Sequence, residues 1–462
     1  MNFDINYFKK FENKIALIDV NDNKYTYGDL IIELKNLKKK FVKNSLILIV
    51  VSNSFESFVG YFSFLDKSKK CTTIILDESF GNEYFNKIIN IYKPNYIFYP
   101  LKFSIKKKLN MKNFTFKKYI FSQTRIPINR NINDKNFILL SSSGTTGNPK
   151  FIRLSRKNII TNTISIIKSL KISSKDRTIT TMPMGYSYGL SIINTHILNG
   201  ASLVINKNNI FEKLFWQKMI KYKVCSFGGV PQFYQFLKKL NFHKFDLTKI
   251  KYISVAGGHL DLNTKKYIMN VCGNNYIKFF SMYGQTETSP RISCFDILRH
   301  KSRINTIGKP INGVKLILIN NKNKDITTFN KKGEIAVMGE NVCLGYANKL
   351  EDLYKGDINK SFIKTGDMGY FDEQHFFYII GRKKKISKIF GIRIDLGDIE
   401  KFLKTKRIDS KCQPDNKKLK IKIMNNYNKD TIINLISKKY KINKNFIEIT
   451  KTKNIKKYGF KK

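Results

Sequence analysis

Arginine and acidic residues are both scarce in this sequence of 462 residues. There are 34 Asp and Glu against 85 Lys and Arg, of which only 11 are Arg, so the formal net charge is +51. A charge of this size can attract nucleic acid, but proteins that read bases usually rely on the planar, bidentate side chain of Arg. Lys, Asn, Ile, Phe and Tyr are abundant together, as a low-GC genome produces. We therefore attribute the charge mainly to codon bias and a solvated surface, and expect no nucleic-acid partner.

Other shortages narrow the class of protein further. The six cysteines form no C-x-x-C pair and the five histidines no cluster, which argues against a disulfide framework and against a His/Cys metal site. The longest apolar run, 46–51, is far shorter than the ~20 residues of a membrane helix, and residues 1–5 show no secretory signal. Hydrophobic residues still make up 42% of the chain, enough for a large core. We expect a cytoplasmic protein without a transmembrane segment.

Short apolar runs alternate with longer amphipathic stretches over much of the chain. Strands are predicted over 46–51, 72–76, 137–140, 178–182, 202–205, 224–227 and 252–256. Helices are predicted over 55–65, 158–170, 211–222 and 231–240. This alternation is typical of a doubly wound, parallel α/β sheet. From about 313 to 380, Gly and Asn turns separate shorter strands, which predicts a β-rich subdomain, and the remaining C-terminal residues indicate a small α+β domain.

A loop rich in serine, threonine and glycine follows the predicted strand 137–140. Glycines there let backbone N–H groups converge on an oxyanion, hydroxyls add donors, and the final lysine adds a positive charge. The loop lacks the Gly-Lys-Ser/Thr ending of a Walker A loop. It predicts a polyphosphate site made of Ser142, Ser143, Gly144, Thr145, Thr146, Gly147 and Lys150.

This loop resembles the phosphate-binding loop of the adenylate-forming superfamily, which includes acyl-CoA synthetases, adenylation domains and luciferases. The resemblance extends over nearly the whole chain, and its most specific segments lie between 142 and 400. It implies an AMP-binding N-terminal domain at 1–382, a hinge at 383–386 and a shortened C-terminal domain at 387–462. Lys384 takes the hinge position, where many members have Asp. In the family, the hinge lets the small domain rotate between adenylation and thioester formation.

Later segments resemble the family's nucleotide and metal motifs, in the family's order. The resemblance assigns Tyr283 to adenine, Asp367 to the ribose hydroxyls and Arg382 to ribose or phosphate oxygens. It places Thr286 near the α-phosphate and Glu287 on Mg²⁺, which prefers hard oxygen ligands. Without the other motifs, Glu287 would more often be a capping carboxylate, Asp367 a residue of a turn and Arg382 a surface residue. The intervening residues assigned to the ATP site are Gly284 and Gln285.

The acyl pocket is assigned to two segments by the same resemblance. Tyr186 falls at a position where many acyl-CoA synthetases carry an aromatic residue or His, and Gly257 and Gly258 match the glycine turn that lines the pocket. No acidic residue lies between 183 and 200, so the ammonium group of an amino acid would lack a counter-ion there. These features favour a small carboxylic acid with a fatty or other apolar tail.

The family's catalytic lysine corresponds by resemblance to Lys456. Thr450 and Ile455 stand where the family has Pro and Gly, and Lys457 and Lys461 lie nearby, so the register of this segment stays open. The resemblance implies an AMP-forming acid–thiol ligase that uses ATP, Mg²⁺ and CoA and passes through an acyl-adenylate. Two alternatives remain: an enzyme that loads the phosphopantetheine of an acyl-carrier protein, and a degenerate, non-catalytic nucleotide-binding homologue.

Overall fold

The computed structural model describes residues 2–105, 112–128, 131–141, 150–383, 386–389, 392–413, 418–424, 427–440 and 442–452. Of the predicted site, residues 142–147 of the phosphate loop, Lys384 and Lys456 lie outside the described residues, whereas Lys150 lies inside them.

An eight-stranded sheet is built mainly from the first 154 residues, in the order β20-β9-β8-β4-β3-β5-β7-β6. Its central strands β5, β3, β4 and β8 are parallel, because α2 (Phe55–Phe64) and α3 (Gly81–Tyr92) serve as crossovers. Every residue of β3 and β4 is buried, as expected for parallel strands covered on both faces. The strands are β3 (Leu46–Val51), β4 (Thr72–Asp77), β5 (Tyr96–Pro100), β6 (Lys112–Phe116), β7 (Tyr119–Gln123), β8 (Ile138–Ser141), β9 (Phe151–Leu154) and β20 (Gly345–Ala347).

A nine-stranded sheet follows the order β16-β15-β14-β13-β12-β10-β11-β1-β2. The strands from β14 to β1 are parallel, and their crossover helices include α6 (Lys213–Lys221), α7 (Pro231–Lys239) and α8 (Leu262–Asn274). The strands are β1 (Ile15–Ile18), β2 (Lys24–Thr26), β10 (Arg177–Ile179), β11 (Ser202–Val204), β12 (Ser226–Gly229), β13 (Tyr252–Val255), β14 (Lys278–Tyr283), β15 (Ser293–Asp296) and β16 (Lys309–Pro310).

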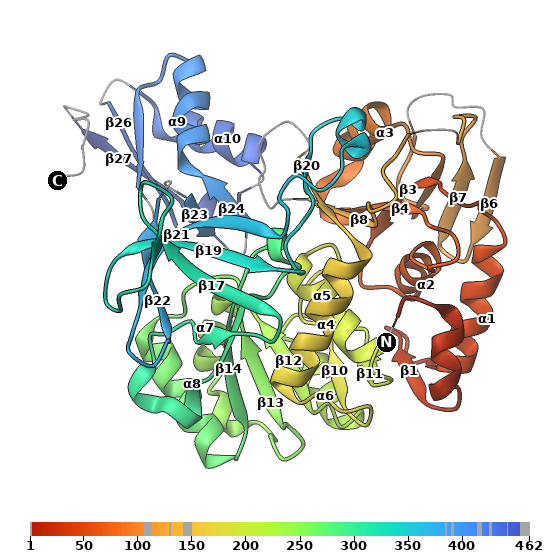
Figure 1. Cartoon of the computed structure of the whole chain (residues 1–462), viewed down its shortest axis with the longest axis horizontal. Helices are drawn as coiled ribbons and strands as arrows, with labels where there is room; N and C mark the ends of the chain where they lie inside the picture. The colour runs from red at the N-terminus through yellow and green to blue at the C-terminus, as the bar shows by residue number, and fades with distance from the viewer. Residues whose placement is uncertain are drawn as a thin grey trace.

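Helices α4 (Arg156–Leu170) and α5 (Ser187–Ile197) lie between the two large sheets (Figure 1). Helix α4 begins where it does because the Ser155 hydroxyl accepts a hydrogen bond from the Asn158 backbone N–H at 3.0 Å. One core cluster combines apolar residues of both sheets with these helices and with α1 (Tyr27–Lys38) and α2. The outer faces are covered by α3 on one sheet and by α6, α7 and α8 on the other.

A five-stranded antiparallel sheet has the order β18-β17-β19-β21-β22. It joins the end of the nine-stranded sheet to the C-terminal region, which is blue in Figure 1. Helices α9 (Leu396–Thr405) and α10 (Lys429–Tyr440) pack with β25, β26 and β27 around a separate apolar core. The remaining strands are β17 (Val314–Ile319), β18 (Asp325–Ile326), β19 (Gly333–Gly339), β21 (Phe362–Phe371), β22 (Phe377–Arg382), β23 (Ile386–Ile389), β24 (Ile392–Asp395), β25 (Ser410–Gln413), β26 (Leu419–Met424) and β27 (Ile447–Thr452).

Short 3₁₀ helices connect several of these elements. One of them, η4, carries the predicted metal ligand. They are η1 (Ile5–Phe11), η2 (Glu78–Phe80), η3 (Phe242–Lys244), η4 (Thr286–Thr288), η5 (Ile297–Arg303), η6 (Leu350–Tyr354) and η7 (Lys444–Phe446).

The predicted fold class is confirmed: α/β sheets with a β-rich part and a small α+β part follow one another along the chain. The strand predicted over 178–182 is shorter, because after Ile179 the chain leaves the sheet and turns into α5. None of the helices in the described ranges combines the length and apolarity needed to cross a membrane.

Candidate active site

Three residues that are far apart in the sequence meet where the nine-stranded and five-stranded sheets adjoin. Tyr283 ends β14, Asp367 lies on β21, and Arg382 lies opposite it on β22. The Tyr283 hydroxyl donates to Asp367 Oδ2 at 2.6 Å, across 84 residues of sequence, and Arg382 Nε lies 2.6 Å from Asp367 Oδ1. The structure therefore brings together the residues predicted for adenine and ribose.

The Asp367 carboxylate is held firmly before any nucleotide arrives. Its side chain is buried, with 3% exposure, and the backbone N–H of the same residue donates to the Thr365 hydroxyl at 3.1 Å. Burial, followed by the negative charge of Asp367, raises the pKa of Tyr283 well above its ordinary value. The Tyr283 hydroxyl therefore stays protonated and remains a donor.

Gly284 permits the sharp return of the chain after β14. A Cβ atom at this position would lie 1.8 Å from the Pro290 carbonyl oxygen, which no side chain can tolerate. The predicted ATP-site residue Gln285 then precedes η4, and its carbonyl accepts a hydrogen bond from the Thr288 hydroxyl at 2.9 Å. This turn holds Thr286 and Glu287 just beyond the end of the strand.

Glu287 is linked through a tyrosine to the predicted phosphate loop. Its side chain is 5% exposed, and the Tyr346 hydroxyl donates to Glu287 Oε1 at 3.1 Å. The ammonium of Lys150 lies 3.8 Å from the centroid of the Tyr346 ring, a cation–π contact. Lys150, predicted to bind phosphate, and Glu287, predicted to bind the metal, thus contact the same tyrosine side chain.

Sequence reasoning missed Tyr346. It lies in β20, which pairs with β9 immediately after Lys150, with Tyr346 opposite Ile152. The only signal in the sequence is an aromatic residue in a short Gly-Tyr-Ala segment, which carries no specific pattern.

One of the two segments predicted to bind the acyl group, the start of α5, contacts the turn that carries Thr286. The Ser187 hydroxyl lies 3.0 Å from the Thr286 hydroxyl. Tyr186 immediately precedes α5, and burial, with a smaller contribution from Asp77, raises its pKa. The start of α5 therefore lies against η4.

A small cavity of about 20 Å³ lies among α4, α5 and strands β10, β12, β13 and β14, and neither Ser187 nor Thr286 lines it. The Tyr188 hydroxyl donates to the Ser254 carbonyl at 2.8 Å on its wall. Tyr186, Gly257 and Gly258 are not among the residues that line it. The lining residues are Ile166, Leu170, Thr178, Tyr188, Ser191, Ile192, Thr195, His196, Ser226, Phe227, Gly228, Tyr252, Ser254, Met282 and Arg291.

Gly257 and Gly258 instead adjoin the start of α7. Cβ atoms there would lie 3.4 Å from Val230 Cγ1 and 3.3 Å from Pro231 Cγ, respectively. Gly257 has φ of +88°, in the left-handed region that favours glycine.

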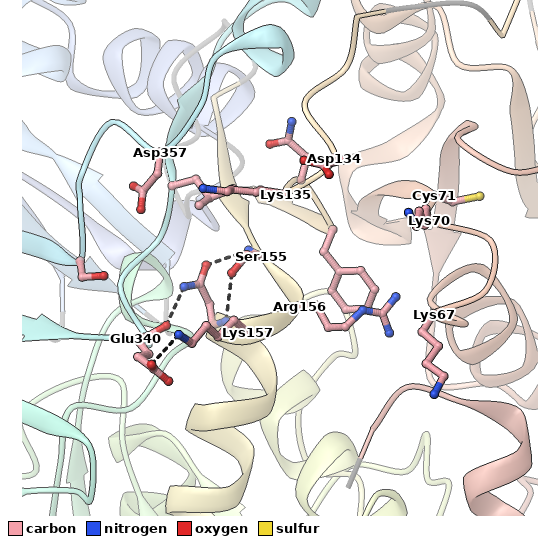
Figure 2. A pocket seen from close by; sticks show the side chains of 15 residues that line it. Lys67, Lys70, Cys71, Asp134, Lys135, Ser155, Arg156, Lys157, Glu340 and Asp357 are labelled. Atoms are coloured by element: carbon pink, nitrogen blue, oxygen red, sulfur yellow. Dashed lines mark hydrogen bonds and ion pairs between the residues drawn. The ribbon is translucent and has the colours of Figure 1, made fainter.

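A wider pocket of about 520 Å³ opens beside the start of α4 and is lined by none of the predicted site residues (Figure 2). Two of its basic side chains have partners: Lys157 pairs with Glu340 at 2.6 Å, and Arg156 lies 4.3 Å from the Phe137 ring. This pocket adjoins residues 136–137 and 155–158, the opposite end of the β8–β9 hairpin from the predicted phosphate loop.

The donor set near Glu287 fits a magnesium ion bound together with nucleotide phosphates. Within the described residues, no group of three or more His, Cys, Asp or Glu could hold a metal by itself. A Mg²⁺ ion bound with a nucleotide needs only one or two carboxylates, because phosphate oxygens and water complete its coordination. The buried Glu287 carboxylate meets that need.

Residues 6–347 match the sequence profile of a family described as "AMP-binding enzyme". The chain belongs to this AMP-binding enzyme family. The resemblance of its motifs to the adenylate-forming superfamily is thereby confirmed.

Relatives of this AMP-binding enzyme are named as CoA ligases for chemically different acids. It is 28% identical to oxalate–CoA ligase of Saccharomyces cerevisiae over 260 residues, which is 56% of this chain and 46% of the yeast protein. It is 29% identical to long-chain-fatty-acid–CoA ligase of Bacillus subtilis over 272 residues, 58% of this chain and 47% of that protein. The alignments span about half the length of these relatives.

Solved structures share the fold over nearly the whole chain. The o-succinylbenzoate CoA synthetase of Bacillus subtilis, bound to a product analogue, matches with a TM-score of 0.77 and 17% identity, covering 97% of this chain and 94% of that one. The structure of IdnL1 matches with a TM-score of 0.81 and 13% identity, covering 97% and 96%. The likeness therefore extends from the large sheets into the small C-terminal part.

Proposed function

We propose that this AMP-binding enzyme uses ATP to activate a small carboxylic acid as an acyl-adenylate and then transfers the acyl group to the thiol of CoA. The observation that carries the proposal is the convergence of Tyr283, Asp367 and Arg382, with Glu287 nearby on the turn that follows Tyr283. AMP and pyrophosphate are the other products. Activity in the cytoplasm is part of the proposal.

The nucleotide would be held by groups of different chemistry. The ring of Tyr283 offers a flat face for adenine, and the fixed carboxylate of Asp367 can accept hydrogen bonds from both ribose hydroxyls. Lys150 and the loop 142–147 would bind the outer phosphates, and Glu287 would hold Mg²⁺, which neutralises phosphate charge. Arg382 keeps Asp367 oriented by its 2.6 Å contact.

In the first half-reaction, a carboxylate oxygen of the acid attacks the α-phosphorus of ATP, and the bond from that phosphorus to pyrophosphate breaks. The protein mainly positions the reactants and stabilises charge. Thr286 would lie near the α-phosphate, and Lys456 would contact the carboxylate and α-phosphate oxygens. In the second, a thiolate attacks the acyl carbon and AMP leaves.

For the acyl group, the sequence favours a tail without an ammonium group, as in a fatty or other apolar acid. The apolar side chains of Ile166, Leu170, Ile192 and Met282 are among those that line the small cavity, which agrees with that expectation. The other lining residues include polar side chains as well as Phe227 and Gly228.

The decisive experiment is ATP–pyrophosphate exchange with a panel of carboxylic acids. Exchange that depends on one class of acid supports adenylation, whereas a degenerate, non-catalytic homologue would bind ATP and show no exchange with any acid. CoA and a phosphopantetheinylated acyl-carrier protein, supplied in parallel, then identify the acceptor. The net charge of +51 is the observation that favours testing an acidic carrier as the alternative.

A further inference from the structure

Two polar side chains of the eight-stranded sheet hold the chain that leads into α5. Asn53 follows β3, and Asp77 is the last residue of the neighbouring strand β4. The carboxyl ends of parallel strands are where open α/β sheets bind their ligands. Asn53 Oδ1 accepts a hydrogen bond from the Met184 backbone N–H at 3.1 Å, and Asn53 Nδ2 donates to the Met182 carbonyl at 3.2 Å. One side-chain amide thus fixes two backbone groups just before α5.

The carboxylate of Asp77 lies directly against the next residue of this chain, Gly185. A Cβ atom on Gly185 would lie 2.7 Å from Asp77 Oδ2 and 2.9 Å from Asp77 Cα, so only glycine can come this close. The backbone N–H of Gly185 donates to the carboxylate, and that of Ser79 donates to Asp77 Oδ1 at 3.1 Å. Asp77 is 4% exposed. Burial raises the pKa of its carboxyl, and the hydrogen bonds from Ser79 and Gly185 partly oppose this rise. A buried acidic side chain therefore holds the backbone of Gly185.

The segment held in this way, 182–187, joins the two parts of the candidate active site. Tyr186, the aromatic residue assigned to the acyl pocket, directly follows Gly185. The hydroxyl of the next residue, Ser187, lies 3.0 Å from the Thr286 hydroxyl. Tyr186 therefore stands between one contact to β4 and one contact to the turn after β14, and its position relative to Thr286 depends on both.

We infer that Asn53 and Asp77 are positioning residues for the acid substrate: they fix the segment 182–187, so that Tyr186 keeps a constant place relative to Thr286. The inference rests on the proposed function, in which Tyr186 contacts the acyl group and Thr286 lies near the α-phosphate. A wall that is fixed in advance binds a ligand more tightly, because less conformational entropy is lost on binding. Weakening these contacts should therefore raise KM for the acid and leave nucleotide binding unchanged.

Two substitutions that conserve side-chain size test this inference in ATP–pyrophosphate exchange. The acid is butyrate, octanoate, palmitate or benzoate, whichever the unmodified protein exchanges fastest. Asp77→Asn removes the charge from the hydrogen bond with Gly185 and should raise KM for the acid about 5- to 10-fold. Asn53→Asp removes the donor to the Met182 carbonyl and should raise it about 3- to 10-fold. In both variants, KM for ATP and the Kd of AMP should stay within about threefold of the unmodified values. A purely structural role would instead reduce the amount of active protein, and so lower kcat with both KM values unchanged.

Asn95→Asp and Asp66→Asn are the matched controls, because these residues make the same kinds of contact ahead of strands rather than after them. Asn95, just before β5, accepts from the Leu46 backbone N–H at 2.8 Å. Asp66, in the chain that leads to β4, accepts from the Ile5 backbone N–H at 3.0 Å. Both controls should leave KM for the acid unchanged. An unchanged acid KM in Asn53→Asp and Asp77→Asn, or an equal rise in the controls, would overturn this inference and leave the proposed function standing.

Amide hydrogen exchange of the unmodified protein tests the same contacts without a variant that has to fold. The N–H groups of Met184 and Gly185 donate to buried or half-buried side chains, so a peptide covering 182–187 should exchange slowly. Exchange as fast as that of the exposed segment 327–332 would overturn the inference. Absence of pyrophosphate exchange with all four acids would instead overturn the proposed function, and the inference with it.

Discussion

Removal of the Tyr283 hydroxyl tests whether its hydrogen bond holds Asp367 in the nucleotide site. Tyr283→Phe removes the 2.6 Å hydrogen bond to Asp367 Oδ2 and keeps the aromatic ring. A hydrogen bond to a charged group contributes about 1.5–3 kcal/mol. Because Asp367 retains Arg382 at 2.6 Å, we expect the lower part of this range, a loss of about 1.5–2 kcal/mol in the free energy of unfolding.

Nucleotide binding should respond differently from stability. Tyr283→Phe keeps the face for adenine, so AMP affinity should change less than about threefold. Tyr283→Ala removes that face, and since stacking of a base on an aromatic ring contributes about 1–3 kcal/mol, AMP affinity should fall about 10- to 100-fold. Urea unfolding and calorimetric titration with AMP measure the two quantities.

The matched control is Tyr276→Phe, because the Tyr276 side chain is 95% exposed and substitutions at such sites change stability by less than about 0.5 kcal/mol. If Tyr283→Phe were as stable as Tyr276→Phe, the hydrogen bond would not hold Asp367 as described. If Tyr283→Phe lost as much AMP affinity as Tyr283→Ala, the adenine assignment would be refuted.

Three further outcomes are expected. Glu287→Gln should raise the Mg²⁺ concentration for half-maximal pyrophosphate exchange about tenfold, because the metal loses one charged ligand. The control Glu351→Gln, at an exposed surface residue, should leave this concentration unchanged. Equal Mg²⁺ dependence in both variants would contradict the metal assignment. Lys456→Ala should abolish acyl-adenylate formation and spare ATP binding, with Lys461→Ala remaining active; the reverse result would move the catalytic position. Burial lowers the pKa of His196 from 6.5 to about 4 in the folded protein. As the pH is lowered, the unfolded chain therefore takes up this proton before the folded protein does. The free energy of unfolding should decrease as the pH falls from 6.5 to 4, by about 2 kcal/mol at pH 5. His196→Gln should flatten this dependence in urea unfolding at pH 5 and 7, and an unchanged slope would show that another group is responsible.

The strands and helices were largely predictable because their hydrophobic patterns are local. The strand predicted over 46–51 is β3 with the same bounds, and the helix predicted over 231–240 is α7, Pro231–Lys239. The strand over 178–182 was predicted too long, because the apolar Met182 and Met184 are buried in the turn before α5 rather than in the sheet. Apolar character indicates burial but not the element that provides it.

The sequence by itself determined the order of the elements, the α/β class and the motif that places Tyr283 and Glu287 on one turn. These depend on neighbours in the chain: apolar periodicity, turn residues and short motifs. Only the tertiary structure decided that Asp367 meets Tyr283 across 84 residues, that Tyr346 contacts both Lys150 and Glu287, and that Arg291 is buried against the Tyr188 ring. Such contacts follow from strand order and sheet packing, which bring residues that are far apart in the sequence into contact.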